Sequence, residues 1–313
     1  MQVQANGLSI EVEDSAAGDA SQLVRPAVVL VMGLGMQLTA WPVDFVQALV
    51  QAGYRVLRFD NRDIGLSQHM DHLGRPALAG SYLRYRLRMS VRAPYTLQDM
   101  AMDTLGVMDA VGVARGHVVG VSMGAMVAQR VALQAPDRVA SLASIMGSSG
   151  ARGLPVPRWP VLRALMARPA DRSPEAVEAF YRRLYRAMGS PGFPTEEADL
   201  QALVHAMVAR SYHPQGSMRQ TAAIVADTTR AAALARLRVP TLVVHGREDP
   251  LLPLAHGEDT ARRIPGAGFA AVGGMGHDLA PGVVQRLLAL LLPFLAAQAP
   301  VVTTGTGRDN PAP

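Results

Sequence analysis

A serine between two glycines is the strongest chemical signal in the sequence, and it lies in the pentapeptide GVSMG at residues 120–124. The apolar run at residues 116–121 is typical of a buried strand, and residues 123–134 have the pattern of a helix. A serine on such a strand-to-helix turn carries its hydroxyl clear of the backbone, and the glycines leave room for close packing. The helix N-terminus also favours negative charge. The pattern predicts that Ser122 is a nucleophile rather than a serine that only shapes the turn.

A serine nucleophile needs a general base, and histidine is a frequent choice. Of the eight histidines, His277 is the best placed, because it follows a late apolar run and lies in the glycine-rich loop at residues 273–278. Nothing in the packing of such a loop requires a histidine. His117 and His245 fall within or at the end of apolar runs and are expected in the core, and His205 falls on a predicted helix. We therefore predict that His277 is the base.

A carboxylate that orients the base is expected in residues 246–250, which directly follow the apolar run at residues 241–245. Two acids lie there, Glu248 and Asp249. The proline after Asp249 restrains its backbone and favours a fixed carboxylate, so Asp249 is the predicted acid and Glu248 the alternative. A carboxylate in this position holds the imidazole in the required tautomer and stabilises its charged form.

Neither a metal nor an organic cofactor is expected. His69 and His72 stand three residues apart beside Asp71, but on a predicted loop and without a third ligand nearby. The chain has no cysteine, which excludes disulfides, thiolate metal sites and cysteine nucleophiles. It also has no lysine, which excludes Schiff-base chemistry on a lysine amine and the phosphate site of a P-loop.

Composition and charge indicate a soluble globular protein. The net charge of +5 over 313 residues is weak support for nucleic-acid binding, which needs clustered charge on one face. The most apolar run, residues 287–299, is shorter than the roughly 20 residues that a membrane helix needs. Residues 1–20 lack the basic and apolar regions of a secretory signal. We expect a cytoplasmic protein that binds no nucleic acid and does not span a membrane.

Short apolar runs alternate with longer amphipathic segments through most of the chain, which favours a parallel sheet with helices on both faces. Strands are predicted at residues 27–32, 54–60, 116–121, 139–146, 241–245 and 269–272, and helices at residues 41–52, 96–111, 123–134 and 281–295. Thr96, with Asp99 three residues later, is the predicted N-cap of its helix.

Two regions interrupt this alternation. Residues 68–94 are rich in Arg, Tyr and Leu, and the arginines there are expected to form a solvated face rather than an anion site: Arg84, Arg86, Arg88 and Arg92. Residues 147–217 have Gly- and Pro-rich borders and helical patterns at residues 160–167, 174–188 and 195–209. They predict a helical cap that gates entry to the site. The core is then residues 1–146 and 218–299, and residues 300–313 are a tail that is expected to be disordered.

With these motifs in order, residues 27–295 resemble a serine hydrolase of the α/β-hydrolase fold with a helical cap. VMGLGMQLTAW at residues 31–41 and RFDNRDIGLS at residues 58–67 resemble the carboxylesterase group that includes aclacinomycin methylesterase. The resemblance implies a mostly parallel central sheet with helices on both faces and the chain order Ser, Asp, His. It also implies a small-molecule ester as substrate and no cofactor.

The family's oxyanion hole, carried over to this chain, consists of the backbone N–H groups of Leu34 and Met123. Gly33 and Gly35 allow the Leu34 N–H to turn toward the substrate without steric penalty.

Two positions depart from the family pattern. Met32 stands where histidine is frequent, and Asp63 stands where glycine is frequent. Arg62 and Asp63 are expected to brace their loop rather than touch the substrate, because a loop without regular pairing needs side-chain partners.

Together these features predict hydrolysis of carboxylic esters through a Ser-His-Asp triad and an acyl-enzyme. The substrate pocket is expected to have an apolar wall supplied by the cap, with Trp159, Tyr181, Tyr185 and Met188. The same triad also serves lactone and C–C bond hydrolysis, cofactor-free perhydrolysis and aminopeptidase activity, and these remain alternatives. A non-catalytic receptor on the same fold is a further alternative.

Overall fold

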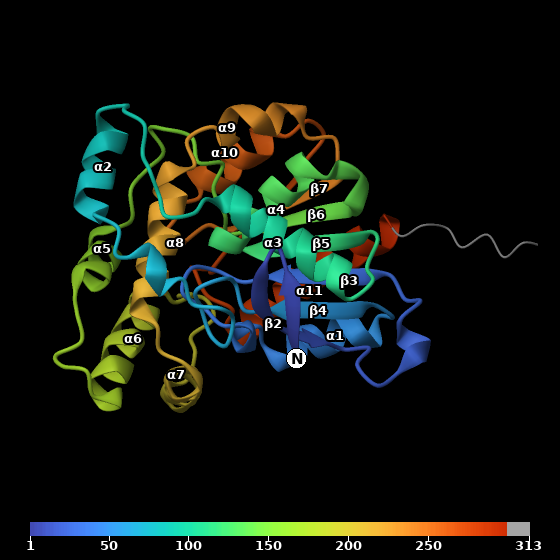
Figure 1. The fold of residues 1–313 in the computed structure, drawn as a ribbon, viewed down its shortest axis with the longest axis horizontal. Helices are drawn as coiled ribbons and strands as arrows, with labels where there is room; N and C mark the ends of the chain where they lie inside the picture. The colour runs from blue at the N-terminus through green and yellow to red at the C-terminus, as the bar shows by residue number, and fades with distance from the viewer. Residues whose placement is uncertain (299–313) are drawn as a thin grey trace, which may run out of the picture.

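The computed structural model describes residues 1–298, and its centre is an eight-stranded sheet in the order β1-β2-β4-β3-β5-β6-β7-β8 (Figure 1). β3 to β8 are parallel, whereas β1 pairs antiparallel with β2 and β2 pairs antiparallel with β4. The strands are β1 (Gln2–Ala5), β2 (Leu8–Asp14), β3 (Ala27–Val31), β4 (Arg55–Phe59), β5 (Gly116–Val121), β6 (Val139–Ile145), β7 (Thr241–Gly246) and β8 (Gly268–Val272). β3 to β8 correspond to the predicted apolar runs, which confirms the predicted fold class.

The hairpin of β1 and β2 is an addition to the predicted strands. Its signal is in the sequence, because Leu8, Ile10 and Val12 alternate with polar residues and are buried. Asn6 and Gly7 form the two-residue turn, with φ of 50° and 75°. Asn-Gly is the dipeptide that such turns favour, because both central residues need positive φ.

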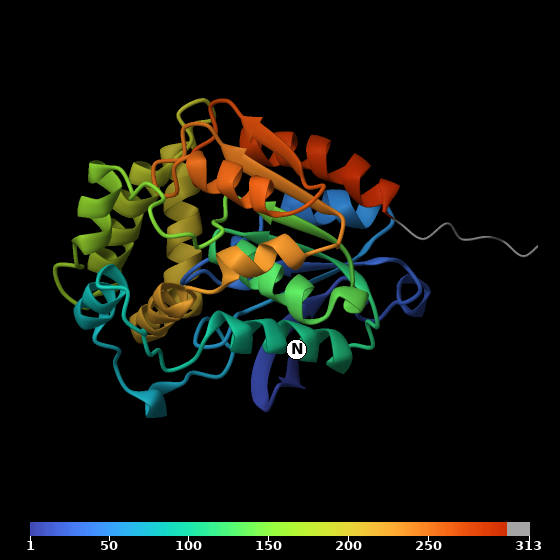
Figure 2. The same cartoon turned by 90° about the horizontal axis from the view of Figure 1, so that it is seen from above.

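Helices cover both faces of the sheet (Figure 2). α3 and α4 share one apolar cluster with the sheet, and α1 and α11 share the other. The helices are α1 (Val43–Gln51), α2 (Leu78–Arg86), α3 (Leu97–Ala110), α4 (Met123–Gln134), α5 (Trp159–Met166), α6 (Pro174–Met188), α7 (Glu197–Arg210), α8 (Pro214–Ala226), α9 (Arg230–Ala233), α10 (Ala255–Arg263) and α11 (Pro281–Ala297).

The N-terminus of α3 confirms the capping interpretation. Thr96 Oγ1 accepts a hydrogen bond from the Asp99 N–H at 3.1 Å, and Asp99 Oδ2 accepts one from the Thr96 N–H at 2.8 Å. This reciprocal pair satisfies two backbone donors that a helix start otherwise leaves free.

α5 to α8 gather at one end of the sheet, on the left in Figure 1. α5, α6 and α7 correspond to the predicted cap helices, and α8 runs across residue 217, where the predicted cap ends. α2, from the interrupting region at residues 68–94, packs against α8. The predicted tail at residues 300–313 lies outside the described residues. Within residues 1–298, no helix has both the length and the apolar character needed to cross a membrane.

Candidate active site

Ser122 lies at the turn between β5 and α4 with a strained backbone, φ 54° and ψ −120°. This left-handed conformation is costly for a residue with a side chain, and it persists where the surroundings enforce it. A Cβ at Gly120 would lie 2.2 Å from the Gly124 carbonyl oxygen, and one at Gly124 would lie 2.0 Å from the Val31 carbonyl oxygen. The two glycines are therefore required for α4 to begin directly against β3 and β5.

The structure brings the three predicted side chains into one hydrogen-bonded row. His277 Nε2 lies 2.9 Å from Ser122 Oγ, and His277 Nδ1 lies 2.7 Å from Asp249 Oδ2. Asp249 is fully buried and His277 is 9% exposed. The loops after β5, β7 and β8 supply these residues, which are far apart in sequence and adjacent at one edge of the sheet.

The Asp249 carboxylate is held from both sides. Its Oδ1 accepts hydrogen bonds from the backbone N–H groups of Leu251 and Leu252, at 2.9 and 2.8 Å. Burial raises the pKa of Asp249, but the charge of His277 and hydrogen bonds from His245 and His277 outweigh it, so the pKa lies below its usual range. The carboxylate is therefore ionised where it meets the His277 ring.

Glu248, the alternative acid, faces a different partner. Its Oε2 accepts a hydrogen bond from the Gly274 N–H at 2.7 Å, in the loop that carries His277. The Glu248 carboxylate thus supports the histidine loop, while Asp249 contacts the imidazole itself.

The predicted oxyanion donors lie next to the serine. A Cβ at Gly33 would lie 3.3 Å from Ser122 Cβ, so the loop at residues 33–35 approaches the serine closely. Within the described residues, neither the Leu34 N–H nor the Met123 N–H has a hydrogen-bond acceptor in the protein. Such amides are free to bind a developing negative charge.

Residues that sequence reasoning missed support this loop. Asn61 Nδ2 donates to the Met32 carbonyl at 2.9 Å, and Gln220 Oε1 accepts from the Gly35 N–H at 2.9 Å. Gln220 is fully buried on α8, 185 residues along the chain from Gly35. No local pattern signals a contact over that separation.

Arg62 and Asp63 brace their loop, as predicted. Arg62 donates to both carboxylate oxygens of Asp103, and Arg219 donates to both carboxylate oxygens of Asp63 at 2.7 Å. Asp63 has φ 75°, a backbone conformation that glycine adopts without steric penalty. Burial raises the pKa of Asp63, but the hydrogen bonds to its carboxylate, first those from Arg219, together with the Arg219 charge outweigh it and lower the pKa overall.

Of the residues considered for a metal, His69 and Asp71 have a third neighbour in the structure, His213, whereas His72 is not part of this group. Ligand atoms of His69, Asp71 and His213 lie within 4.8 Å of one another. However, the Arg219 guanidinium is 3.0 Å from Asp71 Oδ1 and 3.1 Å from His213 Nε2. A positive charge already occupies the position that a metal ion would take, and His69 stacks on His213 with ring centroids 3.9 Å apart. The donor set does not fit a cation.

The predicted pocket residues differ in their surroundings. The Tyr185 hydroxyl lies 3.0 Å from the Met36 sulfur, beside the oxyanion loop. Tyr181 is also withdrawn from solvent, and burial raises the pKa of its hydroxyl to about 12. A narrow hollow runs from Gly35 to the cap, lined among others by Tyr181 and Ser217. Met188 contacts the histidine loop through its carbonyl. Trp159 is 68% exposed at the start of α5.

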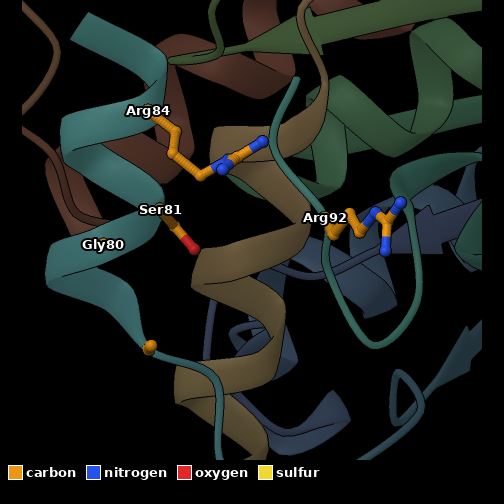
Figure 3. Close-up of a pocket in the computed structure, with 5 residues that line it drawn as sticks. Gly80, Ser81, Arg84 and Arg92 are labelled. Atoms are coloured by element: carbon orange, nitrogen blue, oxygen red, sulfur yellow. The ribbon is translucent and has the colours of Figure 1, made fainter. Parts of the chain in front are cut away.

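A larger cavity of about 500 Å³ lies beside α2, lined by Ala77, Gly80, Ser81, Arg84 and Arg92. The Ser81 hydroxyl and the Arg84 side chain extend from α2 toward α8 (Figure 3). Arg84 Nε donates to the Ser90 carbonyl at 2.8 Å. Arg86 and Arg88 are exposed at the surface. The arginines of this region thus divide between a solvated face and a cavity wall.

The chain belongs to the alpha/beta hydrolase fold family, whose model matches residues 26–280. It is a hydrolase of the class that includes carboxylesterases. A rhodomycin D methylesterase of Streptomyces peucetius is 30% identical over 84% of this chain and 89% of that protein. A 2-hydroxy-6-oxononadienedioate/2-hydroxy-6-oxononatrienedioate hydrolase of Pseudomonas sp. is 28% identical over 94% of this chain and 93% of that protein.

A solved structure gives the same architecture. The crystal structure of an enol-lactonase from Burkholderia xenovorans matches with a TM-score of 0.69 and 22% identity, covering 95% of this chain and all of that one. This likeness shows the fold, and the sequence relatives confirm the resemblance to the methylesterases that the loops at residues 31–41 and 58–67 indicated.

Proposed function

We propose that this protein hydrolyses small-molecule carboxylic esters through Ser122, His277 and Asp249, with an acyl-enzyme intermediate. The observation that carries the proposal is the continuous row of hydrogen bonds from Asp249 Oδ2 through the His277 ring to Ser122 Oγ, at 2.7 and 2.9 Å. A nucleophile, a base and an orienting acid in this geometry can divide ester hydrolysis into two easier steps.

In the first step, Ser122 Oγ attacks the ester carbonyl carbon while His277 Nε2 takes the hydroxyl proton. The carbonyl oxygen becomes an oxyanion, which the N–H groups of Leu34 and Met123 stabilise; one such donor is worth about 10²–10³ in rate. When the intermediate collapses, His277 gives its proton to the leaving alkoxide, and the alcohol departs.

In the second step, His277 takes a proton from water, and the hydroxide formed attacks the acyl-enzyme carbonyl. The second tetrahedral intermediate collapses, His277 returns the proton to Ser122 Oγ, and the carboxylic acid leaves. Asp249 remains ionised and stabilises the imidazolium throughout. The protein groups complete the cycle, so the proposal requires no cofactor.

Two observations support an ester as the substrate class. A relative at 30% identity over most of both chains is named a methylesterase. In addition, Tyr185 lies beside the oxyanion loop on a cap helix, where an aromatic wall suits an apolar acyl group and a small leaving alcohol. A methyl ester of a bulky, apolar carboxylic acid is therefore the proposed substrate type.

A paired measurement tests the function. Hydrolysis of p-nitrophenyl esters from acetate to palmitate is followed beside labelling by a fluorophosphonate probe, for the wild type and Ser122→Ala. We expect Ser122→Ala to lose labelling and to lower kcat by roughly 10³-fold or more, because the triad acts as a unit. A folded Ser122→Ala variant with a tenth of wild-type ester turnover would refute the mechanism.

The reaction alternatives are separated by a second panel of substrates. Turnover of a methyl ester is compared with that of a lactone, an aminoacyl arylamide and a 2-hydroxy-6-oxononadienedioate. The last is the compound in the name of one relative, and it would report C–C bond hydrolysis. If the dienedioate or the lactone gave a higher kcat/KM than the methyl ester, the triad would remain supported but the assignment of an ester substrate would be wrong.

A further inference from the structure

The loop that carries His277 is hydrogen-bonded to the cap at Gly274, Gly276, His277 and Asp278. The His277 N–H donates to the Met188 carbonyl at 2.8 Å. Ser190 Oγ accepts from the Gly276 N–H at 2.8 Å and donates to Asp278 Oδ1, and the Ser190 N–H donates to Asp278 Oδ2 at 3.0 Å. The residues on both sides of His277 are therefore tied to the chain that leaves α6.

The two segments also touch through their backbones. The Gly192 N–H donates to the Gly274 carbonyl at 2.9 Å, and a Cβ at Gly192 would lie 2.6 Å from Gly274 Cα. A Cβ at Gly276 would lie 2.4 Å from the Gly189 carbonyl oxygen. Side chains at these positions would separate the segments, so the glycines of the histidine loop serve close approach to the cap.

The cap segment of residues 188–193, here called the clamp, is itself firmly placed. Pro191 follows Ser190 and fixes the backbone, and the Phe193 N–H donates to the Ser190 carbonyl at 3.1 Å, which closes a tight turn. Phe193 packs on the start of α11, where a Cβ at Gly282 would lie 2.4 Å from its ring. Ser190 is 3% exposed, so its hydroxyl has no competition from solvent.

The other end of this connection reaches the substrate pocket. Tyr185, in the last turn of α6, contacts Met36 of the oxyanion loop, and Met188 at the end of the same helix accepts the His277 N–H. A group bound against α6 therefore presses on the helix whose C-terminus holds the base. Asp278, next to His277, joins the clamp through a carboxylate whose pKa is raised by burial.

We propose that Ser190 is a positioning residue and that the clamp sets the distance between His277 Nε2 and Ser122 Oγ. This proposal rests on the proposed function, because it assigns the clamp to the general base of that reaction. The cap is then part of the catalytic machinery as well as the pocket wall. Substrate that packs against α6 steadies the base at the moment when the base is needed.

The test compares two serine-to-alanine changes at opposite ends of α6, one just before the helix and one just after it. Ser190→Ala removes the clamp hydroxyl, whereas Ser173→Ala removes the N-cap hydroxyl at the opposite end of α6, which accepts the Ala176 N–H at 3.2 Å. Both lose hydrogen bonds, so both lower Tm. We expect Ser190→Ala to lower kcat about 10²-fold with KM within threefold, since a displacement of 1 Å can cost that much. Ser173→Ala should keep wild-type kcat.

The rate of Ser122 modification by the fluorophosphonate probe is the second measurement. It should fall in the same ratio as kcat in Ser190→Ala, because both depend on His277 beside Ser122. Ser190→Thr keeps the hydroxyl and should restore at least a third of wild-type kcat. A wild-type kcat in folded Ser190→Ala, an unchanged probe rate, or a threonine variant as slow as the alanine variant would each overturn the proposal.

The two proposals fail in distinguishable ways. If Ser122→Ala stays active, the proposed function is wrong, and the result for Ser190 has no bearing on it. If Ser122→Ala is inactive and Ser190→Ala turns over normally, the triad stands and only the positioning role is lost.

Discussion

The carboxylate of Asp249 lies between two histidine rings, with His277 Nδ1 at 2.7 Å from Oδ2 and His245 Nε2 at 3.4 Å from the same oxygen. His245 Nε2 also lies 2.7 Å from the Leu252 carbonyl, so that ring is fixed behind the acid rather than free to replace His277. The predicted core position of His245 is correct, and its place in the core is directly behind the acid.

Asp249→Asn is expected to keep the free energy of unfolding near the wild-type value and to lose most of the turnover. An amide at this position favours the wrong imidazole tautomer, and the loss in a comparable triad is about 10⁴-fold in kcat. Glu248→Gln should cost far less, because Glu248 meets the Gly274 N–H rather than the imidazole. Ester kinetics of both variants, with urea unfolding as the check on folding, decide between the two acids. A larger loss of kcat in Glu248→Gln than in Asp249→Asn would show that Glu248 is the orienting acid.

Tyr185→Ala is expected to shift the preferred acyl chain length, because Tyr185 lies against Met36 at the oxyanion loop. Trp159→Ala should leave the preference unchanged within about twofold, since Trp159 is 68% exposed. The measurement is kcat/KM across the p-nitrophenyl ester series for both variants. Equal shifts would place Trp159 in the pocket as the sequence analysis expected.

Acid should destabilise the fold through His117 before it protonates the buried carboxylates of Asp63 and Asp249, whose pKa values lie below their usual range. Burial, with a smaller contribution from Arg115, lowers the pKa of His117 from 6.5 to about 4. The folded state therefore holds this ring neutral, while the unfolded chain takes up a proton below pH 6.5. Above pH 6.5 the ring is neutral in both states, and the contribution of His117 to the free energy of unfolding is complete. As the pH falls from 6.5 to 4, this free energy decreases, by roughly 3 kcal/mol in total.

Urea unfolding at pH 7.5 and pH 4.5 measures this effect. His117→Gln should show a smaller drop in the free energy of unfolding between the two pH values than the wild type. His72→Gln is the control, because His72 is an exposed side chain and should leave the drop unchanged. Parallel curves for the wild type and His117→Gln would show that the acid sensitivity lies elsewhere.

Arg219→Ala, on α8, should be the most destabilising change among the charged residues that brace the loop after β4. It leaves the Asp63 carboxylate buried without its partner, with both side chains fully buried, and such losses cost about 3–5 kcal/mol. Arg186→Ala removes an exposed pair with Glu197 and should cost at most about 1 kcal/mol. Chemical denaturation compares the two. Arg219→Lys should recover little, because one ammonium cannot make both hydrogen bonds to Asp63.

The strands β3 to β8 were predictable because strands buried on both faces leave continuous apolar runs in the sequence. Ser122, Asp249 and His277 were predictable as candidates because each follows such a run, and parallel strands bring their carboxyl ends to one edge. The β1–β2 hairpin also left a readable pattern, in its Asn-Gly turn and alternating side chains.

The supports of the site were not predictable in the same way. Gln220 meets Gly35 across 185 residues, Arg219 meets Asp63 across 156, and Ser190 meets Asp278 across 88. Each contact depends on how the cap packs on the sheet. That packing is decided by elements distant in sequence, not by the local periodicity of apolar residues. A single polar residue on a helix carries no sign of which loop it will reach.

The backbone hydrogen bonds between the clamp and the histidine loop couple closure of the cap over the site to the position of the catalytic base. If the cap swung away from the sheet, the Met188 carbonyl would leave the His277 N–H, and the proton acceptor would drift from Ser122. The open molecule would then lack a base beside Ser122, and the serine hydroxyl alone is a weak nucleophile. The base would return to Ser122 only when the cap closes again over the bound ester. On the clamp proposal, product would therefore leave through small movements that keep the Met188 carbonyl on the His277 N–H.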